Sequence, residues 1–443
     1  MVLTIISRCG YVNGKFETIR AFSPAINQSS ERESLRTLIE GSILSLCHQL
    51  FTKGEVKLLT SEGRIYLDHA ASTPIHPRVR EAILLTLDRV GNPQSIHRDG
   101  EDMRERVEQA RIQVARLIGC KPREIVFTGG GTEAINLALF GLFGQPQAHI
   151  VSTSVEHAAV LAPLRRLEQE GIRLSLVGVS GTGQVKTQQI VERLSSDTRL
   201  VSVQVANNET GVIHDLAELG RILKERGILF HLDAVQGAGL IDLNVDTLSV
   251  DLLSLSAQKM YGPQGVGALY VRQGVLLTPI IWGGRHERGR RAGTENTPGI
   301  VGFGMACELA RLEREERFTH LSSLTEYLES LLLTRIPGVS ISGEKVPRLP
   351  GLTHIVLPGV YGEGVVQSLD RAGFSLSHGA ACSAAGSEVS HVLLAMGFSE
   401  QEAAGGLRIS AGIWTKESEL NKFVERLVPE VERLRNLRRR TGD

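Results

Sequence analysis

The stretch EIVFTGGGTEA, Glu124–Ala134, indicates the class of fold. Its first residues, Glu124–Thr128, are apolar and partly β-branched, as in a strand that is buried on both faces. Three glycines follow, and a helical segment opens at Thr132 directly after them. A strand that passes through a short turn into a helix is the repeating unit of an α/β protein with a mainly parallel sheet.

The same alternation continues along the chain. Segments such as Ala158–Glu170 and Asp215–Glu225 have helical spacing of apolar residues and lie between strand-like runs. Those further runs are His149–Thr153, Arg173–Val179, Arg199–Ala206, Ile228–Ala234, Asp251–Ser256 and Gly267–Val271. We therefore predict a large α/β domain built on a mainly parallel, seven-stranded sheet.

The pattern changes after about Arg311. Long charged helical stretches there flank two apolar strand candidates, Thr353–Leu357 and Leu407–Ser410, which predicts a smaller α+β domain. We expect an N-terminal extension over residues 1–64, a large domain over 65–315 and a small C-terminal domain over 316–443. The first residues of the large domain could pack with the small one.

The composition is that of a globular protein with a large core, because 42% of the residues are hydrophobic and 22% are charged. Lys+Arg and Asp+Glu both total 49, so the balance favours neither nucleic acid nor an anionic membrane as a partner. No apolar run reaches the roughly 18 residues of a membrane-spanning helix. The five cysteines are widely spaced, which argues against a disulfide framework or a zinc site and predicts a reducing, cytoplasmic setting.

The beginning of the chain differs in composition. Residues 1–30 are rich in hydroxyl side chains and carry Arg8, Lys15 and Arg20 against one acid, Glu17. This weakly resembles an organelle transit peptide. A helical extension, or an upstream start that is not part of the working protein, would explain the same composition. Organelle targeting is therefore the alternative to a cytoplasmic location.

Three features suit the chemistry of a phosphate-bearing cofactor. The glycine turn before Thr132 leaves free helix N–H groups that can bind phosphate, although such turns often serve geometry alone. Lys259 follows a buried strand inside a glycine-rich turn, where it is either a Schiff-base lysine or a loop lysine that reaches solvent. Asp233 ends an apolar run, where it would pair with a protonated pyridine nitrogen or cap a turn.

Together, these features resemble a known family. The segments DHAASTP (Asp68–Pro74), FTGGGTEA, EHAAV (Glu156–Val160), NNETG (Asn207–Gly211) and HLDAVQ (His231–Gln236) are similar to those of class V aminotransferase-fold enzymes. SAQKMYGPQGVG, RHERGRRAGTEN (Arg285–Asn296) and HGAACSAAG (His378–Gly386) narrow the resemblance to the NifS/IscS-type cysteine desulfurases. It covers Tyr66 to about Leu434 and implies a fold-type I transferase that depends on pyridoxal 5'-phosphate.

The resemblance implies a role for each matching residue. Lys259 would form the covalent link to the cofactor and then take the α-proton of L-cysteine, and His157 would stack on the ring. Cys382 would take the sulfur as a persulfide. The other cofactor contacts would be Gly131, Thr132 and Ser256 at the phosphate with Gln258, Asp233 at the ring nitrogen, Gln236 at the ring hydroxyl, and Asn208 on the substrate side. Arg408 would clamp the substrate carboxylate beside Asn208.

The resemblance also implies partners. Thr294 matches a position that reaches the phosphate of the neighbouring subunit, which implies a homodimer. A sulfur-acceptor protein or iron–sulfur scaffold is expected as a further partner, and no metal site is implied, although Cys382 could transiently ligate an iron–sulfur cluster. Ser377–Ser390, which contains Cys382, has the composition of a mobile loop. The thiolate form of Cys382 would be favoured by the Lys259 ammonium or by a protonated His157.

Two departures from the family pattern leave alternatives open. Gln258 stands where close relatives have histidine; its amide can donate a hydrogen bond to phosphate but cannot carry a proton. The segment around Cys382 reads GAACSAAG rather than GSACTSG, so a hydroxyl neighbour is lost. A selenocysteine lyase, another class V enzyme and a weakly active sulfur-relay scaffold are the alternatives to a desulfurase.

Overall fold

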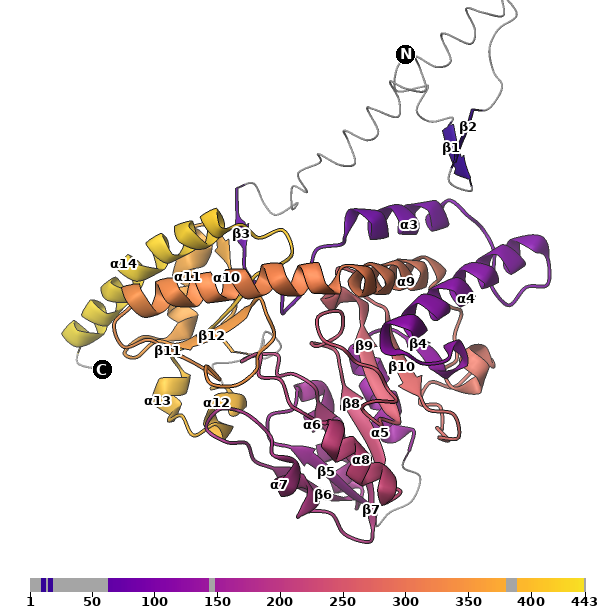
Figure 1. Ribbon diagram of the computed structural model, residues 1–443, viewed down its shortest axis with the longest axis horizontal. Helices are drawn as coiled ribbons and strands as arrows, with labels where there is room; N and C mark the ends of the chain where they lie inside the picture. Colours follow the sequence, from indigo (N-terminus) through magenta and orange to yellow (C-terminus); the bar gives the residue numbers. More distant parts are fainter. Residues whose placement is uncertain (1–8, 13–14, 19–62, 143–147, 380–388, 442–443) are drawn as a thin grey trace, which may run out of the picture. The chain divides into compact units, whose positions relative to one another are not determined.

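The computed structural model describes residues 9–12, 15–18, 63–142, 148–379 and 389–441. The chain divides into two compact units, Met1–Leu58 and Leu59–Asp443. In the first unit, strands β1 (Cys9–Val12) and β2 (Lys15–Thr18) pair antiparallel. All other described elements belong to the second unit (Figure 1). Within the described ranges, no helix is both long and apolar enough to cross a membrane.

The seven-stranded sheet predicted from the sequence is confirmed. Its order is β4-β10-β9-β8-β7-β5-β6, and β10 runs antiparallel to both of its neighbours, while the remaining neighbours pair parallel. The strands are β4 (Ile125–Thr128), β5 (His149–Thr153), β6 (Arg173–Val177), β7 (Thr198–Gln204), β8 (Leu229–Asp233), β9 (Leu252–Ser256) and β10 (Gly267–Val271). The predicted runs were slightly too long at some ends; Glu124, for example, belongs to the short 3-10 helix η1 (Pro122–Glu124).

Helices cover both faces of this sheet, so the fold is a three-layer α/β/α sandwich. Successive side chains of a strand point to opposite faces. Val201 therefore packs in one core with helices α4 (Arg98–Ile118), α8 (Ala217–Glu225) and α9 (Thr297–Leu312). Its neighbour Leu200 packs in a second core with α5 (Gly131–Phe140) and α6 (Ala158–Gln169). Two further helices are α3 (Pro77–Leu87), which packs on α9, and the short α7 (Thr187–Val191).

A smaller α+β domain has its own core. Strands β11 (Ser340–Ile341), β12 (Leu352–Val356) and β14 (Gly406–Ser410) form an antiparallel sheet. Helices α10 (Arg314–Arg335), α11 (Gly362–Arg371) and α14 (Glu417–Thr441) lie along it (Figure 1), with the short α12 (His391–Ala395) and α13 (Glu400–Ala403) nearby. Strand β3 (Ile65–Tyr66) pairs with β13 (Phe374–Ser375), and Leu67 packs in this core. The domain boundaries at residues 64 and 315 stay predictions.

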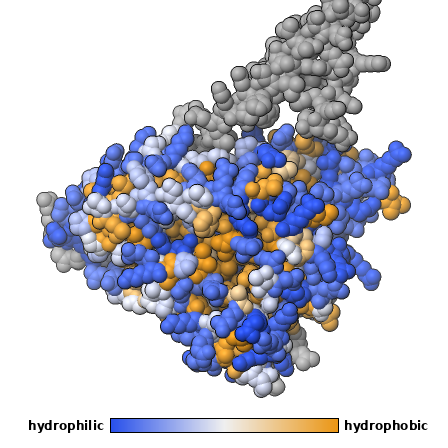
Figure 2. Space-filling model, viewed as in Figure 1, coloured by the Kyte–Doolittle hydropathy of each residue, from blue (hydrophilic) through white to orange (hydrophobic). Residues whose placement is uncertain are grey.

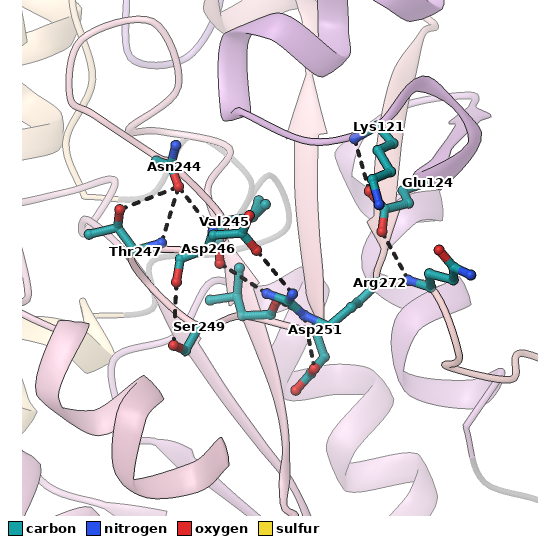
Figure 3. A network of polar contacts seen from close by, with 11 residues as sticks. Lys121, Glu124, Asn244, Val245, Asp246, Thr247, Ser249, Asp251 and Arg272 are labelled. Atoms are coloured by element: carbon teal, nitrogen blue, oxygen red, sulfur yellow. Dashed lines mark hydrogen bonds and ion pairs between the residues drawn. The ribbon is translucent and has the colours of Figure 1, made fainter. Parts of the chain in front are cut away.

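A polar network fixes one end of the large sheet. Arg272 follows β10 and donates to the carbonyls of Val245 and Val250 at 3.1 and 2.8 Å (Figure 3). It also lies 3.3 Å from Asp251, which precedes β9, and 3.1 Å from Asp246. Because β9 and β10 are antiparallel, this anchor sits at the end of the strands away from Ser256. The opposite end, which carries Ser256, is the end that borders the cavity described below.

Candidate active site

The carboxyl ends of the parallel strands border a cavity of about 740 Å³. This edge is where open α/β sheets bind their ligands. Residues named from the sequence meet there, although they come from both domains. Those that line the cavity are Gly131, Thr132, His157, Asn208, Asp233, Gln236, Ser256, Gln258, Lys259 and Arg408.

The glycine turn joins β4 to α5 at the edge of the cavity. The residue before α5 is Gly130, which has no side chain to cap the first turn, so the helix N–H groups there remain available to an anion. A Cβ on Gly131 would lie 2.8 Å from Val235 Cγ2, so only glycine allows this close approach. Glu133 holds the turn, because its carboxylate accepts from Gly129 N at 2.8 Å and pairs with Arg291 at 2.8 Å. The turn is therefore a rigid, electropositive cradle.

Asp233 ends β8 at the base of the cavity. Its side chain is buried, and Oδ1 accepts a hydrogen bond from Val235 N at 3.0 Å. Burial raises the pKa of Asp233 to about 6, because this effect exceeds the opposing effects of Val235 N–H and the Lys259 charge. A cationic group in the cavity would stabilise the ionised carboxylate at this position.

Lys259 lies in the short helix η2 (Ala257–Lys259) after β9. Its Nζ donates to the carbonyls of Ala70 and Ala71, each at 2.6 Å. The neighbouring Thr73 Oγ1 donates to Gln258 O and accepts from Tyr261 N, both at 2.8 Å. The DHAASTP segment therefore holds the lysine turn in place, a task that the sequence analysis did not assign to it.

Gln236 also contacts this segment, since its Nε2 donates to Ala70 O at 3.0 Å. The turn after Lys259 is strained, because Tyr261 has a φ of +62° although it is not glycine. The hydrogen bond from Tyr261 N to Thr73 is one of the contacts that hold this conformation. Backbone strain of this kind is typical of functional sites.

His157 precedes α6 and acts as its N-cap, with Nδ1 accepting from Ala159 N at 3.0 Å. The proton of a neutral ring must therefore lie on Nε2. Burial lowers the pKa of His157, and the nearby charges of Lys259, His391 and Arg408 lower it further. The neutral ring is thus favoured near pH 7, and this disagrees with the protonated His157 considered as a partner for the thiolate.

The sequence analysis gave no role to Glu156, which lies beside His157. Its carboxyl is completely buried, and Oε1 accepts from Thr153 Oγ1 at 2.6 Å and from Gln204 N at 3.1 Å. Burial raises the pKa of Glu156 to about 8, with a smaller contribution from Asp233. The group therefore carries a proton near neutral pH and leaves Asp233 as the ionisable acid of the cavity floor.

Arg408, on β14, brings the small domain to the cavity and is only 1% exposed. Its Nη1 donates to Asn208 O at 2.9 Å and its Nη2 to Asp68 Oδ1 at 2.9 Å. Nε has no hydrogen-bond partner among the described residues. The guanidinium therefore keeps donors for an incoming carboxylate. Like Glu156, Asp68 was named from the sequence only as part of a motif, here DHAASTP.

One predicted site residue, Thr294, does not line this cavity, and another, Cys382, is not among the described residues. Thr294 is exposed and does not line the cavity of its own chain. Cys382 lies within 380–388, outside the described residues. The described residues that flank this segment, Gly379 and Val389, line a second cavity of about 770 Å³ together with Ser390. This cavity shares His157 and Asn208 with the first.

The other described cysteine side chains are not reactive groups. Burial raises the pKa of Cys120 to about 12 and raises that of Cys307, in α9, well above its ordinary value. Both thiols are therefore protonated at neutral pH, as expected of structural cysteines. Cys120 lies just after α4, beyond the C-cap Gly119.

Comparisons with known proteins identify a family. Residues 65–423 match the family model of the class-V aminotransferases. A cysteine desulfurase of Trichormus azollae is 43% identical over 376 residues, which cover 84% of this chain and 94% of the relative. The cysteine desulfurase IscS of Dictyoglomus turgidum is 42% identical over 377 residues, or 84% of this chain and 96% of the relative.

Solved structures show the same likeness. A NifS-like protein superposes with a TM-score of 0.78 at 35% identity and covers 83% of this chain and 99% of its own. SspA in complex with cysteine gives a TM-score of 0.70 at 34% identity, with 78% of this chain and 98% of the other covered. Its motifs, its fold and these relatives show that the chain belongs to the class-V aminotransferase family, among the cysteine desulfurases.

Proposed function

We propose that the protein is a pyridoxal-phosphate-dependent cysteine desulfurase, which converts L-cysteine to L-alanine and holds the released sulfur as a persulfide on Cys382. One observation carries the proposal. A single cavity joins an uncapped helix start, a buried carboxyl group, a lysine amine and a buried arginine. The names of the relatives supply the reaction, and this set of groups suits its cofactor and its substrate.

The residues fit pyridoxal phosphate in charge and position. The cradle at Gly131 and Thr132, with Ser256 beside it, suits the dianionic phosphate, and Gln258 can donate to the same group. Asp233 would hold a proton on the ring nitrogen, and its raised pKa would fall again in such a pair. When bound, this cofactor supplies an electron sink for the carbon atoms of the substrate.

The chain's own residues then have distinct tasks. Arg408 binds the substrate carboxylate with its remaining donors, and Asn208 limits the cavity on the same side. The Lys259 amine accepts the α-proton, while His157, whose neutral form is favoured, would stack on the cofactor ring. The Cys382 thiolate bonds to the substrate sulfur, and the sulfur–carbon bond breaks. The electron pair of that bond stays on the substrate β-carbon, which takes up a proton. Lys259 returns its proton to the α-carbon, and L-alanine is formed.

A homodimer is part of the proposal. Exposed apolar side chains gather on α3 and in the segments after it, and hydrophobic surface is visible over α3 in Figure 2. They include Leu84, Leu85 and Leu87 on α3, with Val90 and Ile96 after it. A second copy of the chain that covers them would remove this apolar surface from water. Thr294, exposed in its own chain, would then be free to contact the neighbouring phosphate cradle.

Mixed dimers test the shared site. In a mixture of Lys259→Ala and Thr294→Glu subunits, one site of each mixed dimer receives a native Lys259 and a native Thr294 from different chains. Activity should therefore reappear on mixing, although each variant alone is weak. If each site were built from one chain, the mixture would be as inactive as the parents, and the dimer model would be wrong.

One incubation tests the reaction itself. The full chain, loaded with pyridoxal phosphate, is given L-cysteine, and alanine, sulfide and the mass of the Cys382 peptide are measured. Equal amounts of alanine and transferable sulfur, with a persulfide on that peptide, support the proposal. Sulfide without the persulfide would indicate a plain C–S lyase. A strong preference for L-selenocysteine would indicate a lyase for that substrate, and absence of cofactor uptake would indicate a scaffold.

The onward partner and the location also belong to the proposal. A protein that accepts persulfide sulfur, such as an iron–sulfur scaffold, is the expected partner, because a thiol-bound sulfur is suited to transfer to another thiol. The cytoplasm is the expected location, since its reducing conditions keep reactive thiols free. One relative, from Encephalitozoon cuniculi, is named as a mitosomal cysteine desulfurase.

A further inference from the structure

Residues 287–291 contact the chain on both sides of the glycine turn. On the side of β4, Glu287 Oε2 accepts from Phe127 N at 2.9 Å. On the side of α5, Arg291 forms an ion pair with Glu133, a residue of the first helical turn, in which Nε lies 2.8 Å from Oε1. The strand that enters the turn and the helix that leaves it are therefore both tied to this one short segment.

A buried ion pair fixes the first of these contacts. Arg111 binds both carboxylate oxygens of Glu287, at 2.7 and 2.9 Å, and also donates to Ile125 O at 3.0 Å. Glu287 and Arg288 have φ values of +47° and +58°, which residues other than glycine rarely adopt. Strain of this kind persists only where neighbouring contacts hold it, so the start of the segment has one fixed position.

The second contact sets the charge beside the turn. Glu133 lines the cavity, and its Oε2 accepts from Gly129 N at 2.8 Å. Both of its oxygens also accept from Arg291, at 2.8 and 3.2 Å. The side chains of Arg291 and Glu133 are 24% and 20% exposed, so water and salt screen the pair only in part. Arg291 itself is not one of the described residues that line the cavity.

An unpaired carboxylate at this position would oppose the binding of a phosphate. Glu133 lies in the first turn of α5, where the positive end of the helix that would attract a phosphate also attracts its own charge. The two anionic groups would repel each other across the cradle. The guanidinium of Arg291 neutralises Glu133 without entering the cavity, while the carboxylate still accepts from Gly129 N.

We propose that Arg291 is a positioning residue, which acts through Glu133 and determines how strongly the cradle prefers a phosphorylated cofactor to an unphosphorylated one. The inference rests on the proposed function. Pyridoxal phosphate and pyridoxal share the ring and the aldehyde that would meet Asp233 and Lys259, and they differ only in the phosphate. An unbalanced charge at Glu133 therefore weakens the binding of the first compound and leaves that of the second nearly unchanged.

The test compares the two compounds on the full chain after any cofactor has been removed. Their dissociation constants are measured from the absorbance of the bound aldehyde at constant ionic strength, and the ratio gives the preference. In Arg291→Gln we expect pyridoxal phosphate to bind about 5- to 30-fold more weakly, as for one charge at a partly buried helix end, and pyridoxal to bind within about twofold of the native value. Arg291→Lys keeps the charge and should retain most of the preference.

A second substitution separates the charge from the loss of a side chain. Glu133→Gln keeps an oxygen that accepts from Gly129 N but carries no charge. The double variant Glu133→Gln/Arg291→Gln should therefore regain a preference within about threefold of the native one. Glu133→Gln alone covers the case in which Arg291→Gln does not fold. It leaves the arginine charge unbalanced beside the cradle, so it should bind pyridoxal phosphate at least as tightly as the native protein does.

The matched control is Arg272→Gln. Arg272 lies 3.3 Å from Asp251, and the two side chains are 26% and 20% exposed, close to the values of the pair beside the cradle. This pair sits at the end of the strands away from the cavity, so its loss should leave the preference for the phosphorylated compound unchanged.

Native affinity for pyridoxal phosphate in Arg291→Gln would overturn the inference. An equal loss of both affinities would also overturn it, because a merely structural role would then suffice. A double variant as weak as Arg291→Gln would mean that the arginine acts on the phosphate directly and not through Glu133. Failure of the proposed function has a different signature, since the native protein would then bind neither compound.

Discussion

Arg408 and Asp68 form an ion pair in which Nη2 lies 2.9 Å from Oδ1, with the arginine side chain 2% and the aspartate 17% exposed. Asp68 also accepts from Ser377, which lies five residues before Cys382 in the chain. One aspartate therefore contacts both Arg408, which is proposed to bind the substrate, and Ser377, which leads to the proposed nucleophile Cys382. A charge this deeply buried depends on its partner, because removing one member of such a pair costs about 3–5 kcal/mol.

Arg408→Lys should raise the KM for cysteine by about 10- to 100-fold, because lysine cannot bind Asp68, the Asn208 carbonyl and a carboxylate with one planar group. Steady-state kinetics on the cofactor-loaded protein provide the measurement. Arg348→Lys is the control, since Arg348 pairs with Glu329 at 2.6 Å, with side chains 12% and 13% exposed, but lines neither of the two cavities. A KM that rises equally in both variants would show a general loss of stability instead of a lost substrate contact.

Lys259→Ala should fold and bind the cofactor without a covalent link. The visible absorbance of an imine should be absent, and borohydride treatment should leave no cofactor attached to the protein. Ala70 and Ala71 lose only the donor that their carbonyls share with Lys259, so the turn should persist through the contacts of Thr73. A covalently trapped cofactor in this variant would mean that another amine forms the link.

Much of the fold could be predicted because buried parallel strands have a simple signature. Runs such as His149–Thr153 and Gly267–Val271 are apolar and short, and they coincide with β5 and β10. Strand direction is not encoded in such runs, so the antiparallel direction of β10 could not be derived from its residues alone. The domain limits depend on long-range packing, such as that of Leu67 in the small-domain core.

The site could be predicted where chemistry restricts the residue type, as at Lys259 and Asp233. Residues that act through another side chain carry no such signal. Asp68 and Glu133 are ordinary acids in sequence, and only the folded chain places them against Arg408 and Arg291. Glu156 could have been suspected, because an acid that follows a buried strand so closely must be paired or protonated.

Asp233→Asn should stabilise the cofactor-free protein above pH 6. The folded-state pKa of Asp233, about 6, lies above the ordinary value of 3.8, so the native state is penalised as pH rises from about 4 through 6. Removal of this penalty is worth at most about 3 kcal/mol at pH 8 and nothing below pH 4. Denaturant unfolding of both proteins across this pH range provides the measurement.

The same substitution should weaken the cofactor-bound protein, because asparagine cannot stabilise a protonated ring nitrogen. The two effects have opposite signs, so the variant should be more stable than the native protein without cofactor and bind cofactor less tightly. The measured quantity is the difference in unfolding free energy between the native protein and the variant. If this difference is the same from pH 4 to pH 8, Asp233 is not the perturbed acid.

The last prediction concerns Cys382. Cys382→Ser should keep the cofactor spectrum and cysteine binding, because Lys259, Asp233 and Arg408, which line the cavity, are unchanged in this variant. It should form no persulfide, since a serine hydroxyl is a poor nucleophile toward sulfur at neutral pH. Mass spectrometry of the Cys382 peptide and sulfide release provide the measurements.

The other thiols serve as controls for this variant. Burial keeps Cys120 and Cys307 protonated, so Cys120→Ser and Cys307→Ala should retain most of the turnover. Alanine is the better replacement at Cys307, because that side chain is fully buried in α9 and a hydroxyl there would lack solvation. Full cysteine-dependent sulfide release from Cys382→Ser would exclude the persulfide route, and direct elimination of sulfide from cysteine would then be the reaction.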